Sequence, residues 1–381
     1  MRTAICERFG IEHPLFAFSH SRHVVAAVTG AGGFGVLGTA TYSPDRLDAE
    51  LSRLDEEVGG RPYGVDVPAP ATVDLRATAT AGDAFARVAD LIPERHRDFV
   101  AHLLAKYGVS TLDPLPGYLA APAEEFGRRV GPEGAAALAE VALKHPIALI
   151  AGASGAPDPA LAAKARAAGV PVAASVGTVE QARRHAAAGA DMIVAQGTEA
   201  GGHTGEITTM VLVPQVVDAV EVPVLAAGGI ASGRQMAAAL ALGAEGVWCG
   251  SVWLTTEEAE TSAPVRRKML AATSLDTTRS TARTGRPARQ LQSAWTDEWD
   301  EATESPGALP PPLQTLVAEA AMARIGRAAE SGNPGAERLA GYFVGQVVGQ
   351  LDRVAPTRQV VQEMIEEFGA AVARLRGVID L

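Results

Sequence analysis

Short apolar runs alternate with longer Ala-rich stretches that carry Glu, Arg or Gln, and this alternation repeats along most of the chain. Most of the runs are too apolar to leave one face in water, which is typical of parallel strands covered by helices on both sides. The alternation therefore predicts repeated βα units. The expected strands, eight in number, lie at 14–18, 35–38, 63–66, 147–152, 170–175, 191–196, 222–227 and 246–250.

The connections between the later strands share one pattern. Helices are expected at 159–168, 179–188 and 232–242, and each is followed by a glycine that can adopt the left-handed conformation of a helix C-cap. Three such units favour an α/β fold of the TIM (β/α)8 barrel type over an open sheet.

Two stretches fall outside the repeat. Residues 79–144 form a longer connection than a single crossover needs, so they predict a helical insertion, and the chain from residue 262 onward loses the βα alternation. We therefore expect a barrel with its insertion over residues 1–261. The remaining residues, 262–381, are expected to form a C-terminal helical extension that packs on the barrel.

Composition bounds the size of the core and the kinds of partner. The 381 residues are 47% hydrophobic and 20% charged, which is enough to bury a large core. The 33 Lys and Arg against 44 Asp and Glu give a net charge of −11, which argues against a broad basic surface for nucleic acid or anionic lipid. A local basic pocket for a phosphate is compatible with this charge.

Cysteine usage and the apolar runs bear on location. Cys6 and Cys249 are far apart in the sequence, which excludes a disulfide framework and suits a reducing compartment. Charged residues near the N-terminus do not fit a secretion signal. Prolines and acidic residues interrupt the apolar stretch at 209–231, so this stretch cannot span a bilayer. We expect a cytoplasmic protein without membrane contact.

One glycine-rich segment matches the dinucleotide-binding fingerprint in its letters only. Residues 30–35 read Gly-Ala-Gly-Gly-Phe-Gly, and Asp55 follows about twenty residues later. The fingerprint requires a strand before the glycines and a helix after them, whereas here the helical stretch 22–29 comes first. We therefore expect a tight turn between a helix and a strand.

The most informative segment, residues 195–205, follows the sixth expected strand and reads Ala-Gln-Gly-Thr-Glu-Ala-Gly-Gly-His-Thr-Gly. Four glycines in eleven residues predict a loop whose backbone N–H groups can approach a ligand. His203 would then lie at the carboxyl end of a barrel strand, where TIM barrels place their active sites. A surface histidine is the alternative, but it explains neither the glycines nor the position.

Two further segments follow the seventh and eighth strands. Gly228 and Gly229 come after one strand, and Gly250 and Ser251 come after the other. A phosphate group needs N–H donors without bulky side chains, and TIM barrels often bind one with the loops at these two positions. The segments therefore favour a phosphate site over ordinary turn glycines.

The sequence contains no motif for a metal site or for a catalytic nucleophile. The eight histidines are scattered without the spacing of metal ligands, so no metal site is expected. We find no Gly-x-Ser-x-Gly motif and no cysteine nucleophile with an activating histidine nearby. Cys249, at a strand end, is better explained by packing. The chemistry is therefore expected to come from a bound cofactor.

Together, these segments resemble the nitronate monooxygenases, formerly called 2-nitropropane dioxygenases. The resemblance rests on residues 196–205, 227–230 and 249–251 and continues at 284–289 and 344–349, so it covers most of the chain. The Glu-Ala-Gly-Gly-His loop is shared with flavin-dependent enoyl-acyl-carrier-protein reductases. It is therefore more specific for the wider superfamily than for the reaction.

The resemblance implies a TIM barrel that binds FMN non-covalently and oxidises alkyl nitronates with O2 to a carbonyl compound and nitrite. It implies His203 as the catalytic residue and a small anionic or nitro-type substrate. An imidazole can hydrogen-bond to a nitronate or take the α-proton of a neutral nitroalkane. The residues expected to bind the cofactor are Ala17, Phe18, Ser19, Asp66, Gln196, Gly201, Gly202, Gly228, Gly229, Trp248, Cys249, Gly250 and Ser251.

The sequence departs from the family pattern at two strand ends. Residues 16–23 read Phe-Ala-Phe-Ser-His-Ser-Arg-His where the family has a Pro-Met-Gly-type turn, and Asp66 stands where the family has Asn. A carboxylate cannot donate a hydrogen bond unless it is protonated, so Asp66 would contact the flavin differently from an amide. His20, Arg22 and His23 either serve an acidic substrate or begin a solvated helix, and both interpretations stay open.

Two other functions remain as alternatives. One is an FMN-dependent enoyl-thioester reductase that uses NAD(P)H, and the other is a non-catalytic flavin-binding barrel. Reaction of the flavin with NADH or with a nitronate would separate the reductase from the monooxygenase. A homodimer is an assembly that the sequence leaves open.

Overall fold

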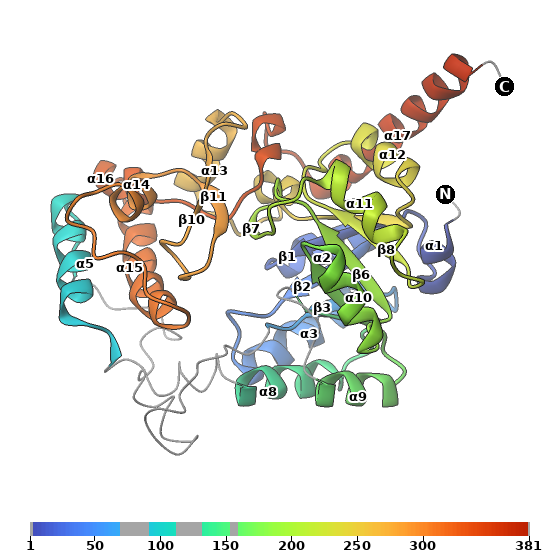
Figure 1. The fold of residues 1–381 in the computed structure, drawn as a ribbon, viewed down its shortest axis with the longest axis horizontal. Coiled ribbons are helices and arrows are strands. Elements are labelled where there is room, and N and C mark those ends of the chain that lie inside the picture. Colours follow the sequence, from blue (N-terminus) through green and yellow to red (C-terminus); the bar gives the residue numbers. More distant parts are fainter. Residues whose placement is uncertain (1–2, 69–90, 112–131, 153–158, 380–381) are drawn as a thin grey trace.

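Eight parallel strands close into a barrel (Figure 1). The barrel strands are β1 (Leu15–Ser19), β2 (Phe34–Gly38), β3 (Gly64–Asp66), β4 (Leu149–Gly152), β5 (Val172–Val176), β6 (Met192–Gln196), β8 (Val224–Ala227) and β9 (Gly246–Cys249). The computed structural model describes residues 3–68, 91–111, 132–152 and 159–379. Each strand lies within two residues of its expected bounds, and the predicted TIM barrel is confirmed.

Helices cover the outside of the barrel, as the βα alternation predicts. Thr178 and Ser232 accept hydrogen bonds from N–H groups in the first turns of α10 (Val179–Ala187) and α12 (Gly233–Ala241), which fixes where these helices begin. The expected glycines follow the helices with positive φ, as at Gly189, where φ is 91°. The other covering helices are α2 (Arg22–Gly30), α3 (Pro44–Val58), α8 (Pro132–Ala142), α9 (Pro159–Ala167), α11 (Thr209–Val217) and α17 (Thr357–Ile379).

The glycine-rich segment at 30–35 is a turn between a helix and a strand. Gly32 has a φ of 87°, and a Cβ on Gly33 would lie 2.9 Å from the carbonyl oxygen of Leu15. The segment leads from α2 into β2, so the strand-then-helix context of a dinucleotide fingerprint is absent here.

Aromatic rings fill the amino-terminal end of the barrel. Phe16 and Phe34 stack with 4.7 Å between ring centroids, and Phe9 of α1 (Ala4–Phe9) meets both rings edge-on. Trp248 stacks on Phe16 with 6.1 Å between centroids. Because this end is packed, the carboxyl ends of the strands are where a ligand can approach the barrel.

A second lobe stands beside the barrel, on the left of Figure 1. Its sheet pairs β10 (Thr277–Ser280) with β11 (Ala288–Leu291), and β11 pairs with the short strand β7 (Gly202–His203) from the loop after β6. The segment from residue 262 onward thus contains two strands that the expectation of a helical segment omitted. Its helices are α13 (Ala263–Ala271), α14 (Ala294–Asp300), α15 (Leu313–Glu330) and α16 (Pro334–Leu339), followed by α17.

The insertion contributes to both parts of the molecule. α5 (Glu94–Lys106) packs on α15 of the second lobe, and Phe99 lies edge-on to Trp299 with 4.9 Å between ring centroids. α8 packs on α3 at the barrel instead. The parts of the expected insertion at 79–90 and 112–131 lie outside the described residues. The domain boundary near residue 261 stays a prediction.

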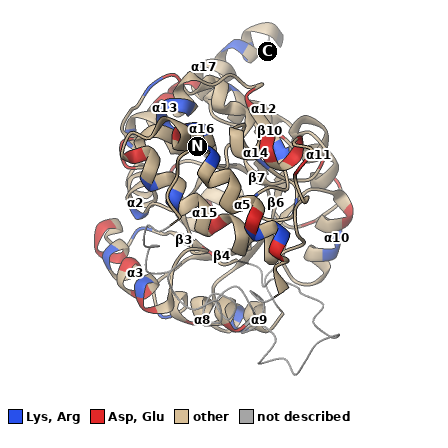
Figure 2. Ribbon diagram, turned by 90° about the vertical axis from the view of Figure 1, so that its left-hand side faces the viewer, with Lys and Arg blue, Asp and Glu red and all other residues tan. Residues whose placement is uncertain are grey.

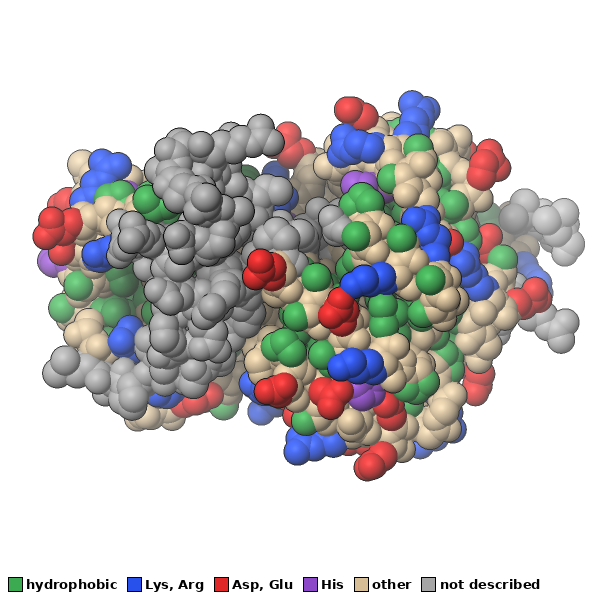
Figure 3. Space-filling model, turned by 90° about the horizontal axis from the view of Figure 1, so that it is seen from below, with side chains coloured by type: hydrophobic (Ala, Val, Ile, Leu, Met, Phe, Trp, Pro, Cys, Tyr) green, Lys and Arg blue, Asp and Glu red, His purple; other side chains and the backbone are tan. Residues whose placement is uncertain are grey.

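Charges of both signs are mixed on the surfaces in view. Figures 2 and 3 show Lys and Arg side chains interspersed with Asp and Glu, without a broad basic area on these faces. In the part of the chain that the structure describes, no helix combines the length and the apolar character that crossing a bilayer requires.

Candidate functional site

The loop after β6 is anchored at its base by Glu199. Its carboxylate accepts hydrogen bonds from the backbone N–H of Thr209 at 3.0 Å and from the Thr209 hydroxyl at 2.8 Å. These contacts cap the N-terminus of α11, where a negative charge is favourable. A Cβ on Gly197 would lie 2.1 Å from Thr209 Oγ1, so this close approach requires a glycine.

Gly201 and the distant Gly345 let two backbone segments pass against each other. A Cβ on Gly201 would lie 2.8 Å from the carbonyl carbon of Val344, and one on Gly345 would lie 2.5 Å from the carbonyl oxygen of Glu199. The N–H of Gln346 donates to the same oxygen at 2.9 Å. These glycines therefore serve packing within the protein, a reason that the sequence analysis missed. Cofactor contact by Gly201 stays a prediction.

His203 is held in β7 by pairing with the second lobe, opposite Ala288, and the φ of 80° at Gly202 favours glycine there. Its Nδ1 lies 3.4 Å from the carbonyl oxygen of Pro287, so Nδ1 carries the hydrogen of the neutral ring and Nε2 keeps a lone pair. Burial lowers the pKa of His203, and the positive charge of Arg286 lowers it further. The ring is therefore a neutral imidazole that can act as a base.

Arginines of the second lobe fasten the His203 loop. Arg289 donates from Nε to the carbonyl oxygen of Thr198 at 2.8 Å, and Arg279 donates from Nη2 to that of Thr204 at 3.3 Å. Sequence reasoning quoted the segment 284–289 as a family motif but assigned no role to its arginines. Their role depends on a sheet between distant segments, which residue spacing does not reveal.

The turns after β8 and β9 present backbone N–H groups that lack protein partners. Gly228 and Gly229 have φ angles of 90° and 68°. Among the described residues, none accepts a hydrogen bond from the N–H of Gly229 or Gly250. A Cβ on Gly250 would meet no atom within 4 Å, so there is open space beside it.

Ser251 completes this donor set. Its Oγ accepts a hydrogen bond from the N–H of Gly345 at 2.8 Å, which leaves the hydroxyl hydrogen available to another acceptor. Unpaired N–H groups, a hydroxyl and a gap without side chains are what a phosphate group requires. The residues present therefore fit the phosphate of a flavin nucleotide, and we call Gly228, Gly229, Gly250 and Ser251 the phosphate cradle.

The alternation of side chains along the strands decides which predicted residues face the barrel interior. Phe16 and Val194 belong to the buried cluster that fills the interior, so the residues two positions later point the same way. By this register Phe18, Asp66 and Gln196 have inward side chains at the carboxyl end, and Trp248 faces the interior at the level of its register partner Phe16.

Three other predicted residues point away from the interior. Ala17 and Cys249 pack in the cluster between the barrel and its outer helices. Burial raises the pKa of the Cys249 thiol to about 12, so it is not a reactive thiolate. The Ser19 hydroxyl accepts from the N–H of Ser21 at 3.1 Å. Ala17 and Cys249 can offer a ligand only backbone groups.

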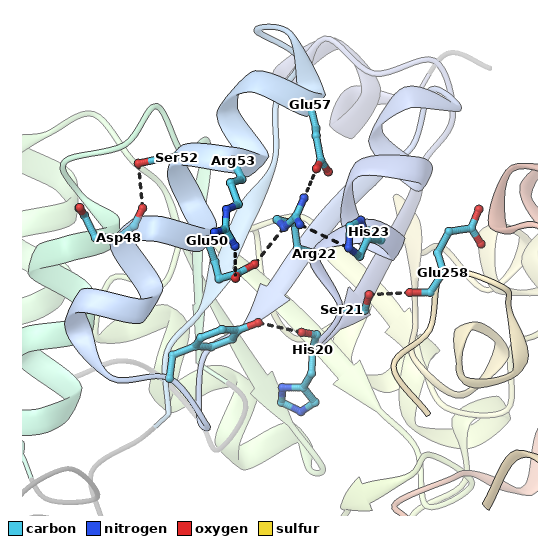
Figure 4. Close-up of polar contacts among 11 residues, drawn as sticks. His20, Ser21, Arg22, His23, Asp48, Glu50, Ser52, Arg53, Glu57 and Glu258 are labelled. Atoms are coloured by element: carbon cyan, nitrogen blue, oxygen red, sulfur yellow. Dashed lines mark hydrogen bonds and ion pairs between the residues drawn. The ribbon is translucent and has the colours of Figure 1, made fainter. Parts of the chain in front are cut away.

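Figure 4 shows the polar and cationic residues that follow β1, His20 to His23. Arg22 at the start of α2 forms ion pairs with Glu50, at 2.9 Å, and with Glu57, both on α3. His23 lies next to Arg22, with 3.4 Å between Nη2 and the His23 Nε2. Arg22 thus joins two helices and is not available to an acidic substrate. The imidazole of His20 points away from this ionic network.

No cluster of three or more His, Cys, Asp and Glu side chains is arranged to hold a metal ion within the described ranges. The site therefore consists of the phosphate cradle, the His203 loop and the inward-facing side chains at the strand ends.

The chain is similar in sequence to named proteins. A protein of Mycobacterium tuberculosis named "Putative monooxygenase Rv1533" is 56% identical over 383 residues, which cover 100% of both chains. Another protein of the same organism, named "(3aS,4S,5R,7aS)-5-hydroxy-7a-methyl-1-oxo-octahydro-1H-indene-4-carboxyl-CoA dehydrogenase", is 33% identical over 315 residues. These residues cover 81% of this chain and 71% of that protein.

A solved structure and a family model give the family. The nitroalkane oxidase from Streptomyces ansochromogenes superimposes with a TM-score of 0.76 at 27% identity, covering 98% of this chain and 100% of that chain. The family model described as "Nitronate monooxygenase" matches residues 2–367. Enzymes of this type are flavin-dependent oxidoreductases. Because the match spans nearly the whole sequence, the chain belongs to the nitronate monooxygenase family.

Proposed function

We propose that the protein is an FMN-dependent nitronate monooxygenase, which oxidises alkyl nitronates with O2 to a carbonyl compound and nitrite. The observation that carries this proposal is the placement of His203 on a loop that follows a barrel strand, held opposite Ala288 with its Nδ1 3.4 Å from the Pro287 carbonyl oxygen. An enzyme that acts on a small nitronate needs positive charge for the anion and a polar group that positions it for reaction. Arg286 and His203 have these two properties.

The phosphate cradle supports FMN as the cofactor. The N–H groups of Gly229 and Gly250 and the hydroxyl of Ser251 would hold the phosphate, and Gln196 at the end of β6 would contact the ring system. Bound FMN supplies the electron acceptor of the reaction. The protein itself holds and positions the substrate anion.

The test replaces His203 by Asn. We expect the wild-type protein to consume O2 and release nitrite from an alkyl nitronate. H203N should purify with its flavin and turn over at least about 100-fold more slowly, because it loses the imidazole that positions the nitronate. H102N is the matched control, since His102 lies exposed on α5 in the second lobe. Full turnover by a flavin-containing H203N protein would contradict the assignment.

A reductase of thioester substrates is the second candidate. It is favoured by the relative named as a carboxyl-CoA dehydrogenase. The two functions differ in what reduces the flavin under anaerobic conditions. Bleaching of the flavin by an alkyl nitronate supports the monooxygenase, whereas rapid bleaching by NADH with no response to nitronate would support the reductase.

A further inference from the structure

The wall of the barrel formed by β1, β2 and β3 lies opposite the His203 loop. In the ring of eight strands β2 and β6 are four positions apart, so they face each other across the barrel. This is the wall where the sequence departs from its family, and the proposed function gives it no part in proton transfer. Its polar residues, His20 and Asp66, flank Gly38 at the end of β2, and we call these three residues the His20 wall.

His20 lies directly after β1, and its ring covers the inner side of Gly38. The ring Nδ1 lies 3.1 Å from the carbonyl oxygen of Gly38. A Cβ on Gly38 would lie 2.8 Å from that nitrogen and 2.7 Å from Cζ of Phe18. Val36, two residues earlier on the strand, belongs to the interior cluster, so this direction points into the barrel. The absence of a side chain at Gly38 makes room for the imidazole.

The contacts of His20 leave one ring nitrogen available. A carbonyl oxygen only accepts, so Nδ1 carries the hydrogen and Nε2 keeps a lone pair. No described residue donates a hydrogen bond to this nitrogen. Phe18 packs against the ring with 5.2 Å between centroids. Burial lowers the pKa of His20 and outweighs the opposing effects of the Gly38 carbonyl and of Glu260, so the ring is neutral.

Asp66 is the neighbour of Gly38 on the adjacent strand. The two residues are partners in the register of β2 and β3. Thr39 donates to the main-chain oxygen of Asp66 from its N–H at 3.1 Å and from its hydroxyl at 2.9 Å, which ties the two strand ends together. The side chain is buried, and no described residue donates a hydrogen bond to its carboxyl group or forms an ion pair with it. Burial raises its pKa well above the ordinary value, which favours the protonated form that can donate a hydrogen bond.

We propose that His20 is a second base of the site, which takes the α-proton of a neutral nitroalkane while the carboxyl group of Asp66 donates a hydrogen bond to a nitro oxygen. This inference rests on the proposed function and assigns a further base to it, for the nitro-type substrate that the family resemblance already implies. The His203 loop, with Arg286 beside it, suits the nitronate anion. The His20 wall has an acceptor and a donor without net charge, and it suits the uncharged acid form of the same compound.

The proton transfer is balanced without a further reactant. The α C–H bond of the nitroalkane breaks, and the proton moves to Nε2 of His20. The electron pair forms the C=N bond, and the negative charge develops on the nitro oxygens. The hydrogen bond from Asp66 strengthens as this charge develops, so it lowers the barrier to ionisation. The product is a nitronate, formed in the site.

The test measures α-proton exchange instead of oxidation. Nitroethane is incubated anaerobically with the flavin-containing protein in D2O, and loss of the α-proton signal is followed by NMR. We expect H20N to reduce enzyme-catalysed exchange at least about 100-fold, because an amide can donate to Gly38 but cannot act as a base. G38A offers a second variant, since its Cβ would displace the imidazole while His20 stays in the sequence. H23N is the matched control and should exchange at the wild-type rate.

Separate outcomes test the inference and the proposed function. Wild-type exchange in H20N, with loss of exchange confined to H203N, would overturn the inference by making His203 the base. Oxidation of preformed ethyl nitronate needs no base, so the ratio of nitronate to nitroethane turnover should rise at least about 100-fold in H20N. If the wild-type protein oxidises no nitronate but shows His20-dependent exchange, the proposed function fails and the second base stands.

Discussion

Two sides of one barrel mouth use different means to present polar groups. After β8 and β9 the groups are backbone N–H donors, exposed because glycines leave the space beside them open. On the His20 wall they are side chains, an imidazole and a carboxyl group, buried against Phe18 and the ends of β2 and β3. Backbone N–H donors do not ionise, so their hydrogen bonding does not change with pH. Buried imidazole and carboxyl groups gain or lose protons according to their surroundings.

The difference explains which side tolerates change. A phosphate cradle fails as soon as a side chain occupies it, so substitutions of its glycines should be poorly tolerated. The His20 wall contacts no phosphate in the proposed arrangement, so substitutions of His20 should leave the phosphate contacts intact. Substitutions on the two sides should therefore separate cofactor binding from proton chemistry.

The largest effect is expected in the phosphate cradle. Gly250→Val places a branched side chain in the open space where the phosphate would lie, so flavin content after purification should fall about tenfold or more. Visible absorbance relative to protein measures it. Gly326→Val, on α15 where a Cβ also meets no atom within 4 Å, is the control and should stay yellow. A G250V protein with full flavin would place the phosphate elsewhere.

An intermediate effect is expected at Asp66, with a defined pH dependence. Burial raises the pKa of Asp66 in the folded state above its value of about 4 in the unfolded chain. At a pH between these two pKa values, the folded protein binds more protons than the unfolded chain. Stability from this group is therefore complete at low pH and is lost as pH rises. Asp66→Asn removes the ionisation, so its Tm should exceed that of the wild type at pH 7, and the difference should shrink towards pH 4.

The comparison for Asp66 is made by thermal unfolding of both proteins across that pH range. Asp352→Asn serves as the control, because Asp352 is exposed and should show no such pH-dependent gain. A constant difference between D66N and the wild type at all pH values would mean that the buried carboxyl group does not titrate between the folded and unfolded states.

The smallest effect is expected behind the His20 wall, at Arg22. Arg22→Ala breaks the ion pairs with Glu50 and Glu57, and the free energy of unfolding should fall by about 1 kcal/mol. Arg53→Ala, whose side chain is 60% exposed, should cost less. Flavin content and turnover should equal those of the wild type. A raised KM with unchanged stability would show that Arg22 binds substrate after all.

The sequence predicted the repeating parts of the fold better than the irregular ones. Uniformly apolar runs separated by Ala-rich helices repeat eightfold, and such local periodicity fixed each barrel strand to within two residues. The small sheet of the second lobe was missed because β7 has only two residues and its partner β11 is distant in the sequence: Pro287, directly before β11, lies 84 residues from His203. No local pattern marks such a pairing.

For the site, the sequence indicated which positions matter more readily than it indicated their structural roles. The glycines at 201 and 345 were visible in motifs, but their close backbone approach depends on three-dimensional packing. The polar residues after β1 were noted with two interpretations, and the structure separates them. Arg22 is committed to α3, whereas the imidazole of His20 turns towards Gly38. Side-chain rotamers and ion-pair partners decide these different roles of Arg22 and His20, and the spacing of residues in the sequence does not predict them.

The pairing of β7 with β11 means that the histidine at the barrel rim is covalently part of one body and hydrogen-bonded into another. The position of the His203 imidazole relative to the barrel therefore depends on where the second lobe sits, and not on the loop after β6 alone.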